Sequence, residues 1–270
     1  MPIHDGVAAL AGCLASLRRT LPPDARLQLV DDASPDPRVA ELLRAFAAAA
    51  PCELAVHTQA RNLGFVASAN AAMARAHGDV ILLNSDTVAT PGWLQRLAAC
   101  ALAVDRLATA TPWSNNAEIC SFPQFCVANP VPADPDAIAA AAARMVPEYP
   151  ELPTAVGFCM LIRRAALDAI GDFDAETFGL GYGEENDFCR RAAAHGWRNV
   201  LCDDAYVAHV GGQSFAPLGL APGGENLNRL VARYPRYNTE VADFIARDPL
   251  APRRAALAAQ LVDATAGAAT

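Results

Sequence analysis

Short apolar runs alternate along the first half of the chain with longer segments in which apolar residues recur every three to four positions. The runs lie at residues 27–30, 54–57, 80–83 and 107–111, and the periodic segments at 7–21, 39–50, 66–76 and 94–104. Short apolar runs between turn formers predict buried strands, and the 3.6-residue period predicts amphipathic helices. Their alternation predicts an α/β fold with a doubly wound, mostly parallel sheet flanked by helices.

The pattern is looser between residues 112 and 153, where prolines cluster and only residues 136–145 look helical. Strand-like runs return at 156–162, 199–202 and 206–209, and helical patterns at 163–170, 184–195, 225–246 (interrupted near Pro235) and 255–264. Residues 1–6 are expected to be the end of a first strand and its turn. Either that strand is short, or its beginning lies outside this chain.

Composition excludes some classes of protein. Of the 270 residues, 53% are hydrophobic, enough for a sizeable core, and the net charge of -8 argues against a nucleic-acid binder. The eight cysteines are scattered without a Cys-x-x-Cys pair, which favours buried free thiols in a reducing cytoplasm over zinc ligands or disulfides. No run of about 18 apolar residues is present, so no membrane span is expected.

Acidic and amide side chains follow two of the predicted strands. Asp31 and Asp32 come after the strand at 27–30, and Asn84 and Asp86 follow the strand at 80–83. The carboxyl ends of strands are where open α/β sheets bind ligands, and Asp86 is a hard oxygen ligand suited to Mg²⁺ or Mn²⁺. Taken alone, a single Asp in this position is better explained by the start of a turn.

Several motifs follow one another in a set order. They are Asp31-Asp32-Ala-Ser, Arg61-Asn-Leu-Gly-Phe, Asn84-Ser-Asp-Thr with Pro91-Gly-Trp, the strand from Gly157, Gly171-Asp-Phe-Asp, Gly183-Glu-Glu-Asn-Asp and His209. Together they resemble the inverting family 2 glycosyltransferases of GT-A fold, especially bacterial members that build O-antigen, cell-wall or capsular glycans. The resemblance covers roughly residues 1–245, which are predicted to form one GT-A domain, with 246–270 as a C-terminal helical tail or linker.

The resemblance implies a nucleotide site near the N-terminus. Pro2 and His4 match the end of the family's first strand beside the base, although His4 replaces a usual Tyr. Asp32 matches the acid that hydrogen-bonds the base, and Arg61 matches a basic residue near it. For Arg61 a solvated loop charge is an equally good explanation. The sequence does not identify the base, and UDP or dTDP is the expectation drawn from the resemblance.

The resemblance also implies a metal site. Asn84 and Asp86 match the family's Asp-x-Asp pair, with Asn in place of the first Asp, which leaves Asp86 as the metal ligand. His209 matches a second ligand near the end of the domain, and the plainer alternative is a histidine that ends a strand. Mn²⁺ or Mg²⁺ is the expected ion, and the mixed oxygen and imidazole ligands lean towards Mn²⁺.

The acids Glu184, Glu185 and Asp187 stand at a predicted helix start. Glu184-Glu185 matches a Glu-Asp pair whose second member is the general base, so Glu185 is the expected base and Asp187 a substrate contact. Free backbone N–H groups at the helix start are expected to keep such a carboxylate ionised, and acids are common there without any catalytic role. Trp113 follows a strand end and is expected to line the acceptor site.

These residues predict a metal-dependent inverting glycosyltransferase that moves a sugar from a nucleotide-diphosphate sugar to a hydroxyl of a glycan or lipid-linked acceptor. The family implies a cytoplasmic protein in peripheral contact with the inner membrane face. The alternative is a non-catalytic nucleotide-binding or scaffolding domain of the same fold within a larger protein. A sugar nucleotidyltransferase would need a glycine-rich, basic loop after its first strand, and residues 4–7 are neither.

Overall fold

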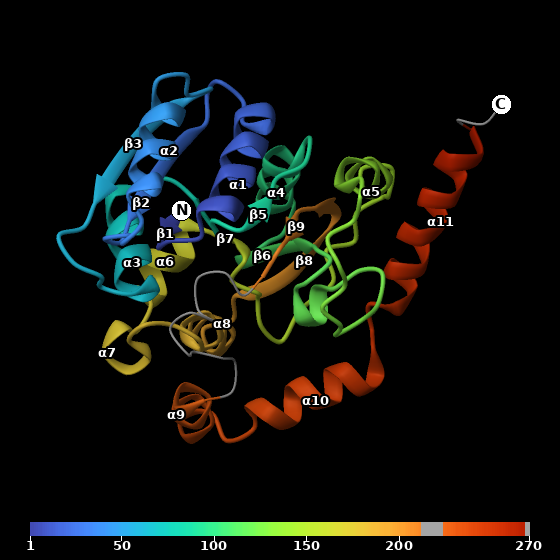
Figure 1. Ribbon diagram of the computed structural model, residues 1–270. Coiled ribbons are helices and arrows are strands. Elements are labelled where there is room, and N and C mark those ends of the chain that lie inside the picture. Colours follow the sequence, from blue (N-terminus) through green and yellow to red (C-terminus); the bar gives the residue numbers. More distant parts are fainter. Residues whose placement is uncertain (212–223, 268–270) are drawn as a thin grey trace.

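The computed structural model describes residues 1–211 and 224–267, which form an α/β fold of mostly parallel strands flanked by helices (Figure 1). Strands β1 (Pro2–Ile3), β2 (Arg26–Asp31) and β3 (Glu53–Thr58) pair in parallel in that order. Helices α1 (Val7–Thr20), α2 (Pro37–Ala47) and α3 (Phe65–Arg75) connect them to one another and to the next sheet. The first half of the predicted pattern is therefore confirmed.

A second sheet has the order β4-β7-β6-β8. Its strands are β4 (Val80–Leu83), β6 (Leu107–Trp113), β7 (Cys159–Ile162) and β8 (Arg198–Tyr206). Strand β6 is parallel to β8, whereas β7 runs antiparallel to both β4 and β6. Helices α4 (Trp93–Ala103) and α8 (Glu184–Ala194) contact β6 and β8.

Periodicity predicted the buried face of α1 correctly. Leu10, Leu14 and Leu17 are at most 4% exposed and belong to the main hydrophobic core. Leu21 caps the end of the helix in an extended conformation, and Pro22 and Pro23 then prevent its continuation. Similar agreement holds for β4, whose bounds are those of the apolar run.

Two predicted strands at 199–202 and 206–209 are replaced by one long strand, β8, and by the short β9 (Ala208–His209). The sequence suggests a break because Asp203 interrupts the apolar run. In the fold Asp203 is fully buried and accepts hydrogen bonds from the backbone N–H of Tyr149 at 3.2 Å and from Arg253 at 2.6 Å. These long-range partners allow the strand to continue through a carboxylate.

The remaining elements lie around the two sheets. They are β5 (Thr87–Val88), the 3₁₀ turn η1 (Glu118–Cys120), α5 (Pro135–Ala142), α6 (Arg164–Ile170), α7 (Ala175–Phe178), α9 (Glu225–Arg233), α10 (Tyr237–Arg247) and α11 (Ala251–Gly267). Helices α9 and α10 run beneath α8 in Figure 1, and α11 extends to the right and contacts α5. Pro235 separates α9 from α10 as predicted. The division of the chain near residue 245 stays a prediction.

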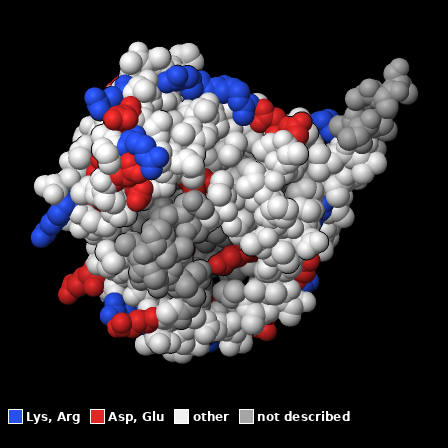
Figure 2. Space-filling model, viewed as in Figure 1, with Lys and Arg blue, Asp and Glu red and all other residues white. Residues whose placement is uncertain are grey.

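All eight cysteines are free, and six of them are buried, as their apolar surroundings predicted. Of the helices that the structure describes, none combines the length and the hydropathy needed to span a bilayer. On the face shown in Figure 2, arginine side chains are interspersed with carboxylates and do not form a continuous basic surface.

Candidate active site

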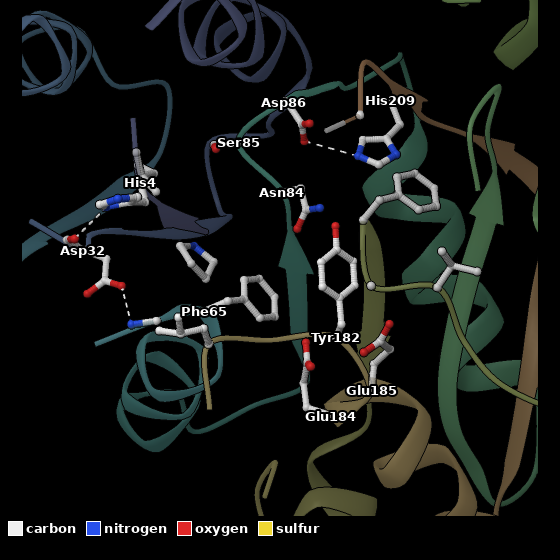
Figure 3. A pocket seen from close by; sticks show the side chains of 18 of the residues that line it. His4, Asp32, Phe65, Asn84, Ser85, Asp86, Tyr182, Glu184, Glu185 and His209 are labelled. Atoms are coloured by element: carbon white, nitrogen blue, oxygen red, sulfur yellow. Dashed lines mark hydrogen bonds and ion pairs between the residues drawn. The ribbon is translucent and has the colours of Figure 1, made fainter. Parts of the chain in front are cut away.

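A cavity of about 320 Å³ opens where β1, β2 and β4 end, and the start of α8 and the end of β9 close its other side. Most of the predicted site residues line it, namely Pro2, His4, Asp32, Asn84, Asp86, Glu184, Glu185 and His209. Figure 3 shows them as three groups around one space, with His4 and Asp32 on one side, Asp86 and His209 on another, and the two glutamates below. The fold therefore brings together residues from both ends of the chain.

The first group is built around Asp32. Its two carboxylate oxygens accept hydrogen bonds from the backbone N–H groups of Leu63 and Gly64, each at 2.8 Å, so the acid at the end of β2 holds the loop after β3. His4 donates from Nδ1 to the backbone oxygen of Asp32 at 3.0 Å, because a carbonyl can only accept. Its Nε2 then accepts from the side-chain amide of Asn62 at 3.1 Å. The imidazole is thus held in one tautomer beside the cavity.

In this loop, Asn62 lines the cavity, whereas Arg61 is exposed and lies outside the cavity lining. The sequence predicted the charged Arg61 as the binding residue of this loop and did not predict Asn62. Gly64 is required here, because it has a φ of +86° and an added Cβ would lie 2.9 Å from the Cα of Leu180. The loop therefore packs tightly against the glycine-rich segment that precedes α8.

The second group is the pair formed by Asp86 and His209. A two-stranded antiparallel pairing of β5 with β9 sets Thr87 opposite His209, and the backbone N–H of Val210 donates to the backbone oxygen of Asp86 at 2.9 Å. This pairing places Nε2 of His209 3.3 Å from Oδ1 of Asp86. Phe158 stacks on the imidazole with ring centroids 5.2 Å apart and limits its rotation.

The orientation of His209 suits a metal ligand. Its Nδ1 lies 2.7 Å from the backbone oxygen of Asn116, so Nδ1 carries the proton. In the neutral imidazole, Nε2 then directs its lone pair at the carboxylate of Asp86, and only a cation or a proton can satisfy both atoms. No cluster of three or more His, Cys, Asp or Glu side chains suited to a metal occurs in the described residues, so Asp86 and His209 are candidate ligands as a pair and not as part of a larger cluster there.

The charge of the cavity has one sign. The acidic side chains among its described lining residues are those of Asp32, Asp86, Glu118, Glu184 and Glu185, and none of the described lining residues is Arg or Lys. A diphosphate brought next to them would be repelled unless a cation accompanied it. The site is therefore electrostatically unsuited to a free nucleotide and suited to a nucleotide–metal complex.

The third group stands at the N-terminus of α8. Gly183 precedes the helix with a φ of +113°, and a Cβ there would clash with the ring of Phe178, 2.9 Å away. Burial raises the pKa of Glu184 well above its usual range, and the charge of the neighbouring Glu185 raises it further. Burial also raises the pKa of Glu185, although the backbone N–H of Gly183 donates to it at 3.3 Å.

Backbone N–H groups at the helix start lower the pKa of both carboxyl groups, as expected. Loss of water around the buried Glu184 and the half-buried Glu185 raises each pKa by more than these donors lower it. Glu184 is 4% exposed, and its Oε2 has no hydrogen-bond partner among the described residues. The two glutamates therefore differ in acidity, and Glu185 loses its proton more easily than Glu184 does.

Two predicted substrate contacts are contradicted by the structure. Asp187 is fully buried and binds Arg233 at 2.7 Å, Arg191 at 2.8 Å and the hydroxyl of Tyr234 at 2.8 Å, so it joins α8 to α9. Trp113 is also fully buried, and its indole N–H donates to the backbone oxygen of Asp203 at 3.1 Å. Both side chains belong to the core, where no substrate reaches them.

Tyr182 and Glu118 are further cavity residues that the sequence did not predict. Tyr182 belongs to the glycine-rich loop before α8, and in Figure 3 its hydroxyl points towards the end of β4 that carries Asn84. Glu118 comes from the loose 112–153 region and has a φ of +46°, which is unusual for a residue other than glycine. The glycine-rich loop was a usable signal for Tyr182, whereas local sequence offered none for Glu118.

Comparison with known proteins identifies the family and the fold. The family model "Glycosyl transferase family 2" matches residues 1–171. No curated protein sequence matches the chain. A structure of GalNAc-T7 with UDP, GalNAc and Mn²⁺ superposes with a TM-score of 0.63 at 16% identity, over 86% of this chain and 46% of that one.

Two further solved structures share the fold. The mannosyltransferase PcManGT from Pyrobaculum calidifontis, in complex with GDP-Man and Mn²⁺, has a TM-score of 0.59 at 16% identity and is matched over 98% of this chain and 73% of its own. TarS (1–349) from S. aureus has a TM-score of 0.56 at 18% identity, with 85% and 61% covered. At such low identities, these likenesses concern the fold. The chain spans about half the length of the GalNAc-T7 structure.

Proposed function

Because the chain belongs to glycosyl transferase family 2, we propose that it is a metal-dependent inverting glycosyltransferase acting on a nucleotide-diphosphate sugar. The acceptor in this proposal is a hydroxyl group of a glycan or a lipid-linked glycan. The observation that carries it is the Asp86–His209 pair, whose acceptor atoms face each other in a cavity lined by carboxylates. This arrangement calls for a cation and an anionic ligand together.

Asp86 and His209 would hold the metal, with the tautomer of His209 fixed by Asn116. When bound, a divalent ion supplies positive charge that stabilises the leaving diphosphate. Ligation by one oxygen and one imidazole favours Mn²⁺ over Mg²⁺. The GalNAc-T7 and PcManGT structures, which contain Mn²⁺ with UDP and GDP-Man respectively, support the choice of ion.

Glu185 acts as the general base. Burial and the charge of Glu185 raise the pKa of Glu184 more than the pKa of Glu185 is raised. Glu184 therefore retains the proton while Glu185 is ionised. Glu185 accepts the proton of the acceptor hydroxyl as its oxygen attacks the anomeric carbon. The bond from that carbon to the diphosphate oxygen breaks on the opposite face, which inverts the configuration.

The base of the donor is assigned to the end of the cavity that holds His4, Asp32 and Asn62. Asp32 orients the loop, and its oxygens have further lone pairs for a base N–H. We assign UDP or dTDP as the nucleotide, and the UDP in the GalNAc-T7 structure supports the former. A cytoplasmic location with peripheral contact to the inner membrane face is part of the proposal, and the free cysteines support a reducing compartment.

Calorimetric titration tests the proposal. UDP, dTDP, GDP and CDP are titrated into the wild-type chain and into Asp86→Ala, each with and without Mn²⁺. We expect one nucleotide to bind only with Mn²⁺, and Asp86→Ala to lose that binding while it unfolds at an unchanged temperature. Metal-independent binding in both proteins would overturn the metal assignment. Metal-dependent binding without turnover of any matching nucleotide sugar would favour the non-catalytic alternative.

A further inference from the structure

A second cavity of about 310 Å³ adjoins the first. Four residues line both cavities: Glu118, Val156, Tyr182 and Glu185. The expected general base therefore stands on the boundary between the two spaces. A group in the second cavity could present a hydroxyl to Glu185 while the donor occupies the first.

The outer wall of the second cavity comes from the C-terminal helices. Leu227 and Leu230 belong to α9, and Tyr237 and Val241 belong to α10. These residues lie beyond residue 171, where the match to the family model ends. The wall is apolar with one aromatic ring, a surface that packs against the C–H groups of a sugar ring or another apolar face.

Two polar side chains of this cavity, Asn186 and Glu118, have hydrogen-bonding groups that a ligand can use. The side-chain oxygen of Asn186 accepts hydrogen bonds from the hydroxyls of Thr154 at 2.7 Å and Tyr237 at 2.6 Å. Its NH₂ group has no partner among the described residues and remains a donor. No hydrogen-bond donor in the described part of the chain reaches the carboxylate of Glu118, which remains an acceptor. A ligand with several hydroxyls satisfies both groups.

The charge of the second cavity restricts the class of ligand that can bind there. The charged side chains among the described residues that line the second cavity are Glu118 and Glu185, both acidic. An acceptor whose reacting residue carries a carboxylate or phosphate would be repelled by them at short range. An uncharged hexopyranose has the hydroxyls that the polar groups require and the C–H faces that the apolar wall requires.

Building on the proposed function, we propose that this second cavity is the acceptor site and that it selects an uncharged pyranose residue. Asn186 and Glu118 bind its hydroxyls, and Leu227, Tyr237 and Val241 pack against its ring. The C-terminal helices thereby contribute to the choice of acceptor, whereas the donor cavity is lined by residues from both sides of residue 171, among them Asp86 and His209. The same pyranose could end a free oligosaccharide or a lipid-linked one.

Ligand-observed saturation-transfer NMR tests this on the full chain, with methyl glycosides of glucose, galactose and mannose and with methyl glucuronide as the charged counterpart. The measurement is made without nucleotide and again with UDP and Mg²⁺. Val241→Trp and, as a second variant, Leu227→Phe fill the cavity. Ala242→Trp adds the same bulk on an exposed position of α10 and serves as the control.

We expect at least one neutral glycoside to bind, the glucuronide to bind at least tenfold more weakly, and the two filling variants to lose tenfold or more in affinity. Ala242→Trp should bind as the wild type does. The proposal is overturned if no neutral glycoside binds in either condition, if the glucuronide binds equally well, or if both filling variants bind normally. Failure of the proposed function would show separately, as a wild-type chain that binds no nucleotide.

Discussion

Nε2 of His209 lies 3.3 Å from Oδ1 of Asp86, and the same ring donates from Nδ1 to the backbone oxygen of Asn116 at 2.7 Å. The pairing of β5 with β9 creates this relationship. Gly211, two residues after His209, has a φ of +81°, and a Cβ there would collide with the side-chain amide of Asn116. The geometry of the metal pair therefore depends on a residue that is not itself a ligand.

Gly211→Ala should weaken metal-dependent nucleotide binding by roughly 10- to 100-fold, the usual effect of disturbing a group that orients a ligand. Gly171→Ala is the matched control, because Gly171 has a φ of +86° but nothing lies within 4 Å of its added Cβ. Both variants should lose about 1–3 kcal/mol of stability, because a residue with a side chain disfavours the positive φ at each position. Equal nucleotide affinity in the two variants, measured by calorimetry, would remove Asn116 from the metal site.

Glu185→Gln should lower the rate of sugar transfer by roughly 10²- to 10⁴-fold, the contribution typical of a general base. Nucleotide affinity in the presence of Mn²⁺ should stay within about twofold of wild type, because the metal pair is untouched. Glu176→Gln, at an exposed acid on α7, controls for the loss of one negative charge. Transfer by Glu185→Gln at the wild-type rate would exclude Glu185 as the base.

The pH dependence of transfer should report the raised pKa of Glu185. Transfer needs the ionised form, so its rate should rise with pH through a value above the roughly 4.3 of an ordinary Glu. Glu118 raises this pKa by charge repulsion, and a hydrogen bond from Glu184 lowers it. Glu118→Gln should thus move the acid limb of the rate profile to lower pH, and Glu184→Ala to higher pH.

Since Glu118 is exposed to solvent, the movement caused by Glu118→Gln should stay below about one pH unit. Identical acid limbs in all three proteins would contradict this.

Stability should depend on pH through Glu184. Its folded-state pKa is raised, so its protonated form stabilises the fold below a pH of about 4.3, and this contribution is lost as the pH rises through the folded-state pKa. Glu184→Gln cannot ionise, so its advantage over the wild type should grow by about 1.4 kcal/mol for every pH unit between the ordinary pKa of a Glu and that of folded Glu184. Thermal unfolding between about pH 4.5 and 8 measures this. A difference that is constant across the range would show that Glu184 titrates normally.

The buried ion pairs of Asp187 should hold α9 in place. Arg233→Ala removes one partner of a carboxylate that is fully buried, and we expect a loss of about 1–3 kcal/mol, since Arg191 remains. Arg236→Ala, at an 84% exposed side chain that lies 3.6 Å from Glu240, should cost less than about 0.5 kcal/mol. Chemical denaturation compares the two. Equal losses would mean that the Asp187 cluster contributes nothing beyond a surface pair.

Elements of the described fold could be predicted from the sequence where a single local pattern of apolar residues defines them. The apolar face of α1 and the run that forms β4 were correctly predicted because burial of a face imposes its own period. The same reasoning divided β8 in two, because it treats a carboxylate such as Asp203 as a break. Only Arg253 and the loop at Tyr149, both distant in sequence, make that carboxylate compatible with a buried strand.

In the candidate site too, some features are predicted by local sequence and others depend on contacts between distant residues. The side chains that end the strands and open α8 could be predicted from the sequence, because turn chemistry and the order of motifs are local properties. Tertiary structure decided that Asp86 meets His209, that Glu118 reaches the cavity, and that Trp113 and Asp187 are core residues. It also raised the pKa values of Glu184 and Glu185, because the loss of water around a carboxylate depends on everything packed against it.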